Sequence, residues 1–191
     1  FTITNGFNSS SSYMAGGITT VNSFPVLKNI IVENNTGTFG AGIMVESSEA
    51  YISNAIVRNN NGDEAGGIRS IFSNIYIDST EVYNNSGYVT GAGILIYEDS
   101  PNDREASITN SHIHDNTTTY IGGGFHFSNA NVLLDHVLVE DNESQAEGGG
   151  ISMGATYHID IINSTIVDNN SLSDSGENIA NVWGVDDDMT L

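Results

Sequence analysis

The chain has 191 residues and carries 24 Asp or Glu against four Lys or Arg, which gives a formal net charge of −20 at pH 7. This charge repels nucleic-acid phosphates and anionic lipid surfaces, so nucleic acid is not an expected partner. The sequence has no cysteine and no apolar run of about 18 residues, which excludes disulfides and predicts no insertion into a membrane.

Short segments that combine a small residue, a glycine and an apolar residue recur from the N-terminus onward. Their apolar residues are spaced 25, 25, 26, 31 and 26 residues apart. These residues are Ile18, Ile43, Ile68, Ile94, Phe125 and Ile151. A period of this length is typical of a repeat protein in which each structural unit stacks on the next.

Two further series lie between successive glycine segments, in which an aliphatic residue is followed eight residues later by an asparagine. The aliphatic residues are Leu27, Ile52, Ile77, Ile108, Leu134 and Ile162. The asparagines are Asn35, Asn60, Asn85, Asn116, Asn142 and Asn170. Because loop tips would not keep this spacing, we expect a buried asparagine ladder in which each amide bonds to the next coil. The alternative is that these asparagines lie at the tips of solvent-exposed loops.

Runs such as Ile43–Val45 and Phe125–Phe127 alternate with period 2 and are too short for helices. The pattern predicts an all-β fold, a right-handed single-stranded parallel β-helix of about seven coils of 25–31 residues. Each coil should have three strands and three turns, and the glycine-linked apolar residues should form one buried column. We expect residues 1–191 to be a single β-helix domain and a segment of a longer solenoid. Phe1–Gly6 is typical of the closing strand of a coil, and Met189–Leu191 of the opening of another.

Each of these asparagines also follows an aliphatic residue by three positions, in an aliphatic-x-x-Asn motif that begins at Val32, Val57, Val82, Ile113, Val139 and Val167. The Gly-linked and aliphatic-x-x-Asn motifs resemble the repeats of the polymorphic outer-membrane protein and autotransporter-passenger group, within the pectate-lyase-like β-helix superfamily. Here the apolar residue follows the glycine directly, and Val or Ile replaces the Phe typical of the second motif. The resemblance covers nearly the whole chain. It implies the fold and an extracellular or cell-surface location in a bacterium, but no particular chemistry, because one such fold hosts many functions.

Two groups of residues are candidates for holding a metal ion. His112 and His114 alternate on one strand and should point outward together, with Glu81 beside His112, and with Tyr83 and Glu140 flanking His114. The alternative is a solvated polar stripe. An insertion in the fourth coil supplies the other group, whose carboxylates suit Ca²⁺ unless the loop is simply solvated. Its candidate ligands are Glu98, Asp99 and Asp103.

The outward positions of the glycine-linked strands are candidates for a binding surface. They are Met44, Arg69, Ile71, Leu95, Tyr97 and His126. Several of them are apolar, so a flat sheet could present them to a glycan or to another protein. The alternative is that a neighbouring loop covers them.

These observations favour a non-catalytic extracellular or cell-surface repeat segment with a structural or adhesive role, binding polysaccharide, a surface protein or further coils of the same protein. One alternative is part of a carbohydrate-active enzyme, a polysaccharide lyase or glycosidase, whose catalytic coils lie outside this segment. Another is a calcium-stabilised solenoid of a large secreted protein. A catalytic site within the segment is disfavoured because the glycine-linked strands have almost no carboxylates and basic residues are few. The basic residues are Lys28, Arg58, Arg69 and Arg104.

No cofactor is required, although Ca²⁺ is a candidate ligand.

Overall fold

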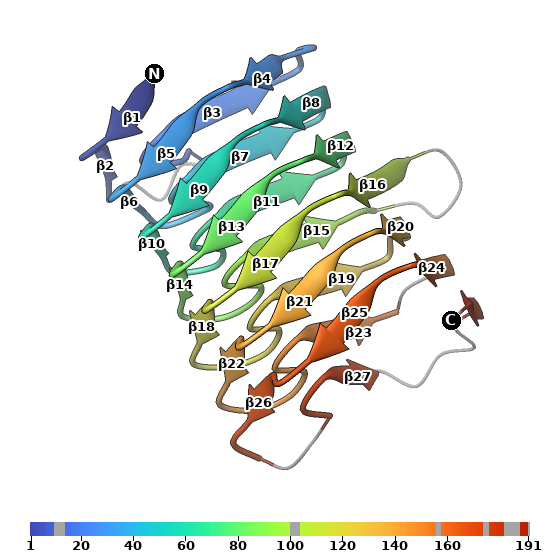
Figure 1. Ribbon diagram of the computed structural model, residues 1–191. Coiled ribbons are helices and arrows are strands. Elements are labelled where there is room, and N and C mark those ends of the chain that lie inside the picture. Colours follow the sequence, from blue (N-terminus) through green and yellow to red (C-terminus); the bar gives the residue numbers. More distant parts are fainter. Residues whose placement is uncertain (10–13, 100–103, 156–157, 174–175, 182–187, 191) are drawn as a thin grey trace.

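The computed structural model describes residues 1–9, 14–99, 104–155, 158–173, 176–181 and 188–190, and every regular element in these ranges is a strand. The strands wind into a parallel β-solenoid of about six turns (Figure 1). The predicted fold class is confirmed, although the coil count is slightly below the expected seven.

The solenoid has four parallel sheets of seven strands each, which we name A to D. Sheet A consists of β1 (Thr2–Thr4), β5 (Ile31–Glu33), β9 (Ile56–Arg58), β13 (Glu81–Tyr83), β17 (His112–His114), β21 (Leu138–Glu140) and β25 (Thr165–Val167). Sheet B consists of β2 (Phe7–Asn8), β6 (Thr36–Gly37), β10 (Asn61–Gly62), β14 (Ser86–Gly87), β18 (Thr117–Thr118), β22 (Glu143–Ser144) and β26 (Asn170–Ser171).

The other two sheets contain the longer strands. Sheet C consists of β3 (Ile18–Val21), β7 (Ile43–Glu46), β11 (Ile68–Ile71), β15 (Ile94–Tyr97), β19 (Phe125–Ser128), β23 (Ile151–Gly154) and β27 (Ile179–Asn181). Sheet D consists of β4 (Val26–Lys28), β8 (Glu49–Ser53), β12 (Asn74–Asp78), β16 (Glu105–Thr109), β20 (Asn131–Asp135), β24 (His158–Ile162) and β28 (Asp188–Thr190). The expectation of three strands per coil was wrong because the strands of sheet B have only two residues, too few for an alternating pattern in the sequence.

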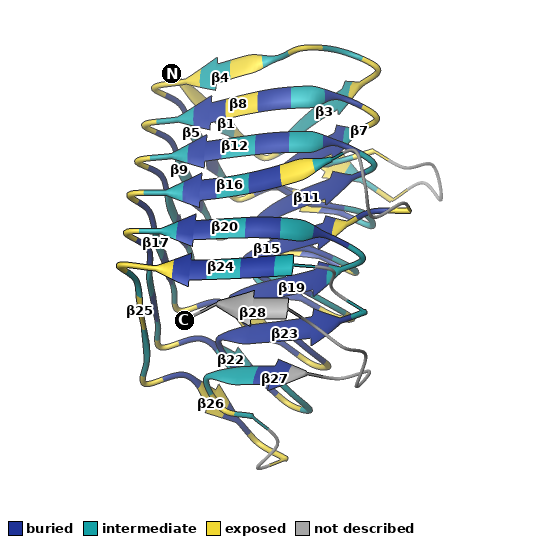
Figure 2. Ribbon diagram, turned by 90° about the vertical axis from the view of Figure 1, so that its right-hand side faces the viewer, coloured by how far each residue is buried: buried dark blue, intermediate teal, exposed yellow. Residues whose placement is uncertain are grey.

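The interior is filled by columns of apolar side chains, one from each coil, that stack in register. Ile43, Ile68 and Ile94 pair as neighbours in sheet C and are fully buried, and Phe125 and Ile151 continue the column. Ile18, in the first full coil, is only partly buried. Along sheet D, buried and partly exposed residues alternate in most strands, as Figure 2 shows for β12 and β20. The predicted column is therefore confirmed.

Residues with positive φ turn the chain at the corners of each coil. The corner between sheets A and B has φ of +55° at Asn34 and +52° at Asn84, and the corner between sheets D and A has +48° at Asn54. Asparagine tolerates this left-handed conformation better than other residues with a Cβ. The abundance of asparagine in the sequence thus follows from the number of corners.

The buried asparagine ladder is confirmed at the corner between sheets A and B. In each step an Asn side chain donates from Nδ2 to Oδ1 of the Asn in the next coil, at 2.9 Å from Asn35 to Asn60 and 3.0 Å from Asn85 to Asn116. Oδ1 of Asn60 also accepts from the backbone N–H of Asn35 at 3.0 Å. The side chains consequently satisfy each other and the backbone in a place that water does not reach.

The prediction that Asn170 is the last member of the ladder was wrong. Asn142 donates to Asn169 at 2.9 Å, Asn169 is buried, and Asn170 is exposed. The last residue of the predicted aliphatic series, Ile162, is also off by one position. Ile161 pairs with Leu134, and Ile162 faces outward. Two consecutive isoleucines and two consecutive asparagines make two registers of this coil fit the repeat pattern. A shift of one residue between these registers turns every side chain to the opposite face of the sheet.

Candidate functional site

The residues predicted to form a binding surface on sheet C are mostly buried. Met44, Arg69, Ile71, Leu95 and His126 are buried, and only Tyr97 of this set is exposed. The alternative of a covering loop was therefore correct.

The loops between sheets B and C pass directly over these side chains. A Cβ placed on Gly40 would lie 2.8 Å from Cβ of Arg69, and one on Gly122 would lie 3.0 Å from Cβ of His126. Both glycines have positive φ, +65° and +72°. Glycine is needed here because it permits both the left-handed turn and the close approach.

Burial under these loops gives the polar members of the set unusual surroundings. Arg69 forms an ion pair with Glu64 at 2.7 Å and lies over the ring of Phe39. His126 contacts Ser152 through Nδ1 at 3.1 Å, and burial lowers its pKa to about 4, so it is neutral at pH 7. Arg69 and His126 therefore lie beneath the cover of sheet C and are shielded from solvent.

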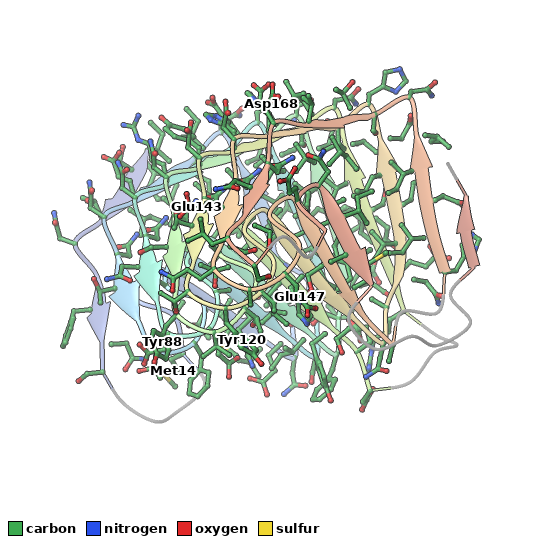
Figure 3. All side chains as sticks on the ribbon, turned by 90° about the horizontal axis from the view of Figure 1, so that it is seen from below. Met14, Tyr88, Tyr120, Glu143, Glu147 and Asp168 are labelled. Atoms are coloured by element: carbon green, nitrogen blue, oxygen red, sulfur yellow. The ribbon has the colours of Figure 1, made fainter. Side chains whose placement is uncertain are left out.

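Exposed apolar side chains occur in the covering loops instead. Met14, Tyr88 and Tyr120 lie near one edge of the solenoid in the view of Figure 3 and are 52%, 67% and 57% exposed.

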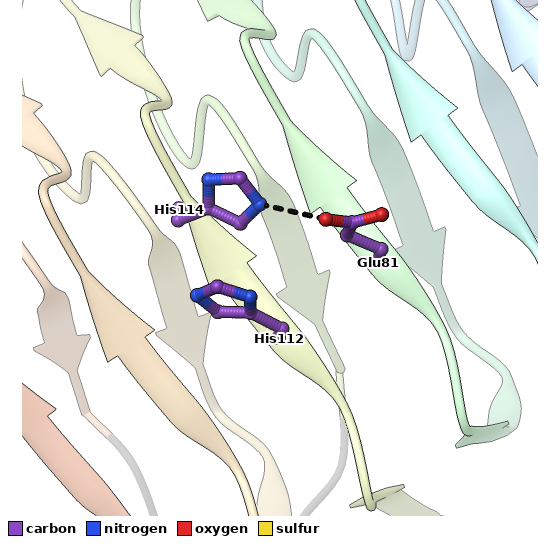
Figure 4. A group of neighbouring side chains, drawn as sticks. All are labelled: Glu81, His112 and His114. Carbon is purple, nitrogen blue, oxygen red and sulfur yellow. Dashed lines mark hydrogen bonds and ion pairs between the residues drawn. The ribbon is translucent and has the colours of Figure 1, made fainter.

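The two histidines predicted to act together do meet, on the outer face of sheet A (Figure 4). His112 and His114 both come from β17, and their rings stack with centroids 4.0 Å apart. Nε2 of His114 lies 3.1 Å from Oε1 of Glu81, on β13. Nε2 of His112 lies 3.0 Å from Oε1 of Glu140, on β21. The predicted backbone register is confirmed, since Glu81 lies beside His112. The side-chain contact is diagonal, because the carboxylate of Glu81 reaches His114 and not His112.

Further side chains hold His114 in place. Nδ1 of His114 donates to Oδ2 of Asp115 at 2.7 Å, and the ring stacks on Tyr83 at 4.9 Å with an interplanar angle of 6°. The hydroxyl of Tyr83 accepts from Nη1 of Arg58 at 2.7 Å, and Arg58 forms an ion pair with Glu33 at 2.7 Å. Asp115, which follows the second histidine directly, is not among the residues predicted from the sequence.

Two of the three predicted calcium ligands, Glu98 and Asp99, contact other groups of the protein. Glu98 is only 2% exposed, and its Oε1 accepts from the backbone N–H of Ser73 at 3.0 Å. Arg104 contacts Glu98 at 3.2 Å and Asp99 at 2.7 Å. Burial raises the pKa of Glu98 to about 7 despite these two donors. Asp103 lies outside the described residues, so the calcium site stays a prediction.

Sheet D presents an aromatic feature that was not predicted from the sequence. Tyr51 and Tyr76 occupy one outward row, and their rings stack with centroids 4.7 Å apart and an interplanar angle of 16°. Tyr51 donates to Glu49 at 2.7 Å, and this hydrogen bond raises its pKa. A signal existed in the sequence, since each tyrosine directly precedes one of the repeated isoleucines, Ile52 and Ile77.

Beside Tyr76 the outer face is hollowed, because the next residue in the row is the small Ser107. The hollow has a volume of about 330 Å³. It is lined by Tyr76, Glu105, Ala106, Ser107, Asn131, Val132, Leu133, His158 and Asp160. An aromatic ring, the aliphatic side chain of Leu133 and several polar groups therefore border one depression on a flat sheet, whereas the side chains of Ala106 and Val132 are buried in the core.

No family model, curated protein or solved structure matches the chain significantly. The described residues contain no helix with the length and hydrophobicity needed for a membrane crossing.

Proposed function

We propose that this protein is a non-catalytic solenoid of a secreted or cell-surface bacterial protein that binds a polysaccharide on the outer face of sheet D. The observation that carries the proposal is the Tyr51–Tyr76 stack, which ends at the hollow over Ser107. The resemblance of the repeat motifs to the autotransporter-passenger group supports the location.

The size of the hollow suits one sugar ring. Tyr76, Ser107 and Leu133 follow one another in successive coils, and strands in a sheet are about 4.8 Å apart. Tyr76 and Leu133 are therefore separated by about 9 to 10 Å, which leaves room for a pyranose above the small serine. The apolar face of such a ring would continue the aromatic stack on Tyr76.

The polar groups around the hollow suit hydroxyl groups of a neutral glycan. Glu105 and Asp160 are acceptors, and Asn131 offers both donors and acceptors. The net charge of −20 disfavours acidic polysaccharides. We therefore expect binding to be detected with neutral oligosaccharides, for which cellohexaose and chitohexaose are suitable probes.

Isothermal titration calorimetry with each probe tests the proposal. Tyr76→Ala should weaken binding about two- to tenfold, the effect of losing one ring contact. Tyr120→Ala removes an exposed tyrosine elsewhere and should leave binding unchanged. Equal affinity of the two variants, or no binding of either probe, would contradict the proposal. Release of new reducing ends during the titration would instead support the carbohydrate-active alternative.

A further inference from the structure

We propose that His112, His114 and Glu81 form a binding site for a divalent transition-metal ion, with Zn²⁺ as the representative ion. One ligand atom from each of these side chains lies within 4.8 Å of the other two. The three side chains come from the adjacent strands β13 and β17, so a bound ion would join two successive coils. This site lies on sheet A and is independent of the proposed glycan surface on sheet D.

The hydrogen bond between His114 and Asp115 determines which nitrogen is available. Because a carboxylate accepts, the contact at 2.7 Å places a proton on Nδ1 of His114. In the neutral ring Nε2 is then an acceptor, and it faces the carboxylate of Glu81 at 3.1 Å. Two acceptors at this distance repel unless a cation, either a proton or a metal ion, lies between them. A metal ion satisfies both lone pairs.

His112 is arranged in a complementary way. Its Nε2 is held by Glu140 at 3.0 Å, which leaves Nδ1 for an ion shared with His114 and Glu81. Metal-binding histidines usually donate their second nitrogen to a carboxylate, which fixes the ring and raises its basicity. Asp115 and Glu140 are therefore positioning residues, one for each histidine.

The donor set indicates the class of ion. Two imidazole nitrogens and one carboxylate suit Zn²⁺, Cu²⁺ or Ni²⁺, whereas Ca²⁺ and Mg²⁺ prefer sites made entirely of oxygen. Ligand atoms around a tetrahedral Zn²⁺ are about 3.4 Å apart, so the present spread closes by small side-chain rotations. The side chains of His112, His114 and Glu81 are 34%, 16% and 43% exposed, so an ion can enter and the remaining coordination positions face water.

The chain offers a matched control for this arrangement. His136 also lies on the outside and contacts an aspartate, Asp135, at 2.7 Å. It is not part of the cluster of His112, His114 and Glu81. A general attraction of cations to the acidic chain would not distinguish His136 from His114, whereas a chelating site would.

Calorimetric titration of the whole chain with ZnCl₂, at an ionic strength of about 0.15 M and in excess Mg²⁺, tests the proposal. The wild-type chain should bind one Zn²⁺, and His114→Asn and Glu81→Gln should each weaken binding by at least about tenfold. Asp115→Asn should weaken it by about tenfold through the loss of orientation. His136→Asn should bind as the wild type does.

A measurement on the wild-type chain does not depend on the folding of any variant. The electron paramagnetic resonance spectrum of one equivalent of Cu²⁺ should show coupling to two imidazole nitrogens. Displacement of Zn²⁺ by Mg²⁺, equal affinity of His114→Asn and His136→Asn, or a Cu²⁺ spectrum with oxygen ligands alone would each overturn the site. These results would leave the contacts as proton-mediated ion pairs.

Discussion

Replacing Asn85 with alanine tests the asparagine ladder at its centre. The Asn85 side chain donates to the carbonyl of Val57 and to Oδ1 of Asn116, both at 3.0 Å. Its own Oδ1 accepts from the backbone N–H of Asn60 at 3.1 Å and from Nδ2 of Asn60 at 3.0 Å. Alanine keeps the backbone N–H that bonds to Asn116, and Nδ2 of Asn60 keeps its bond to Val32. The N–H of Asn60 and the carbonyl of Val57 each lose a partner.

An unpaired buried polar group costs about 1 to 3 kcal/mol, so the two groups that lose a partner should lower the free energy of unfolding of Asn85→Ala by about 2 to 6 kcal/mol. Urea titration followed by circular dichroism measures this loss, and an unchanged slope shows that the same unit unfolds. Asn61→Ala is the control, because Asn61 is exposed and the change should stay within about 0.5 kcal/mol. Asn84 is unsuitable, since its φ of +52° would cost alanine about 1 to 2 kcal/mol. A loss below about 1 kcal/mol at Asn85, or equal to that at Asn61, would refute a stabilising ladder.

Three further changes test the core and the two buried titratable groups. Ile68→Ala should cost about 2 to 5 kcal/mol because Ile68 is fully buried, and equal destabilisation by Ile56→Ala on the outer face would contradict this. The pKa of Glu98 is raised from 4.5 to about 7 in the folded state, so its contribution to stability is full below pH 4.5 and is lost as the pH rises through 7. The free energy of unfolding of Glu98→Gln should therefore rise by about 2 to 3 kcal/mol relative to that of the wild type between these pH values. A difference in the free energy of unfolding that does not change with pH in urea titrations would count against it. The pKa of His126 is lowered from 6.5 to about 4, so stability is present above pH 6.5 and is lost as the pH falls to 4. His126→Leu places at this position the residue that the preceding coil has at Leu95, and it should reduce the acid-induced fall in the free energy of unfolding by about 2 to 3 kcal/mol. An acid transition identical to that of the wild type would show that His126 does not contribute.

The repeat pattern was sufficient to predict the solenoid, its buried column and most of its ladder. A repeat of nearly constant length places equivalent residues beside each other in successive coils, and the period of two residues decides which of them face inward. The same logic predicted that His112 and His114 share one outer face. It failed in the last coil, where Asn169 and Asn170 both fit the spacing and only packing selects between them.

The surroundings of the outward-facing residues became apparent only from the packing of loops and side chains in three dimensions. Alternation indicates that Met44 and Leu95 point away from the interior, but it does not show that loops containing Gly40 and Gly91 cover them. Backbone register pairs Glu81 with His112, whereas the side chain reaches diagonally to His114. Neither outcome follows from alternation alone. The cover depends on the path that each loop takes over the sheet, and the diagonal contact depends on the side-chain conformations of Glu81 and His114 in adjacent coils.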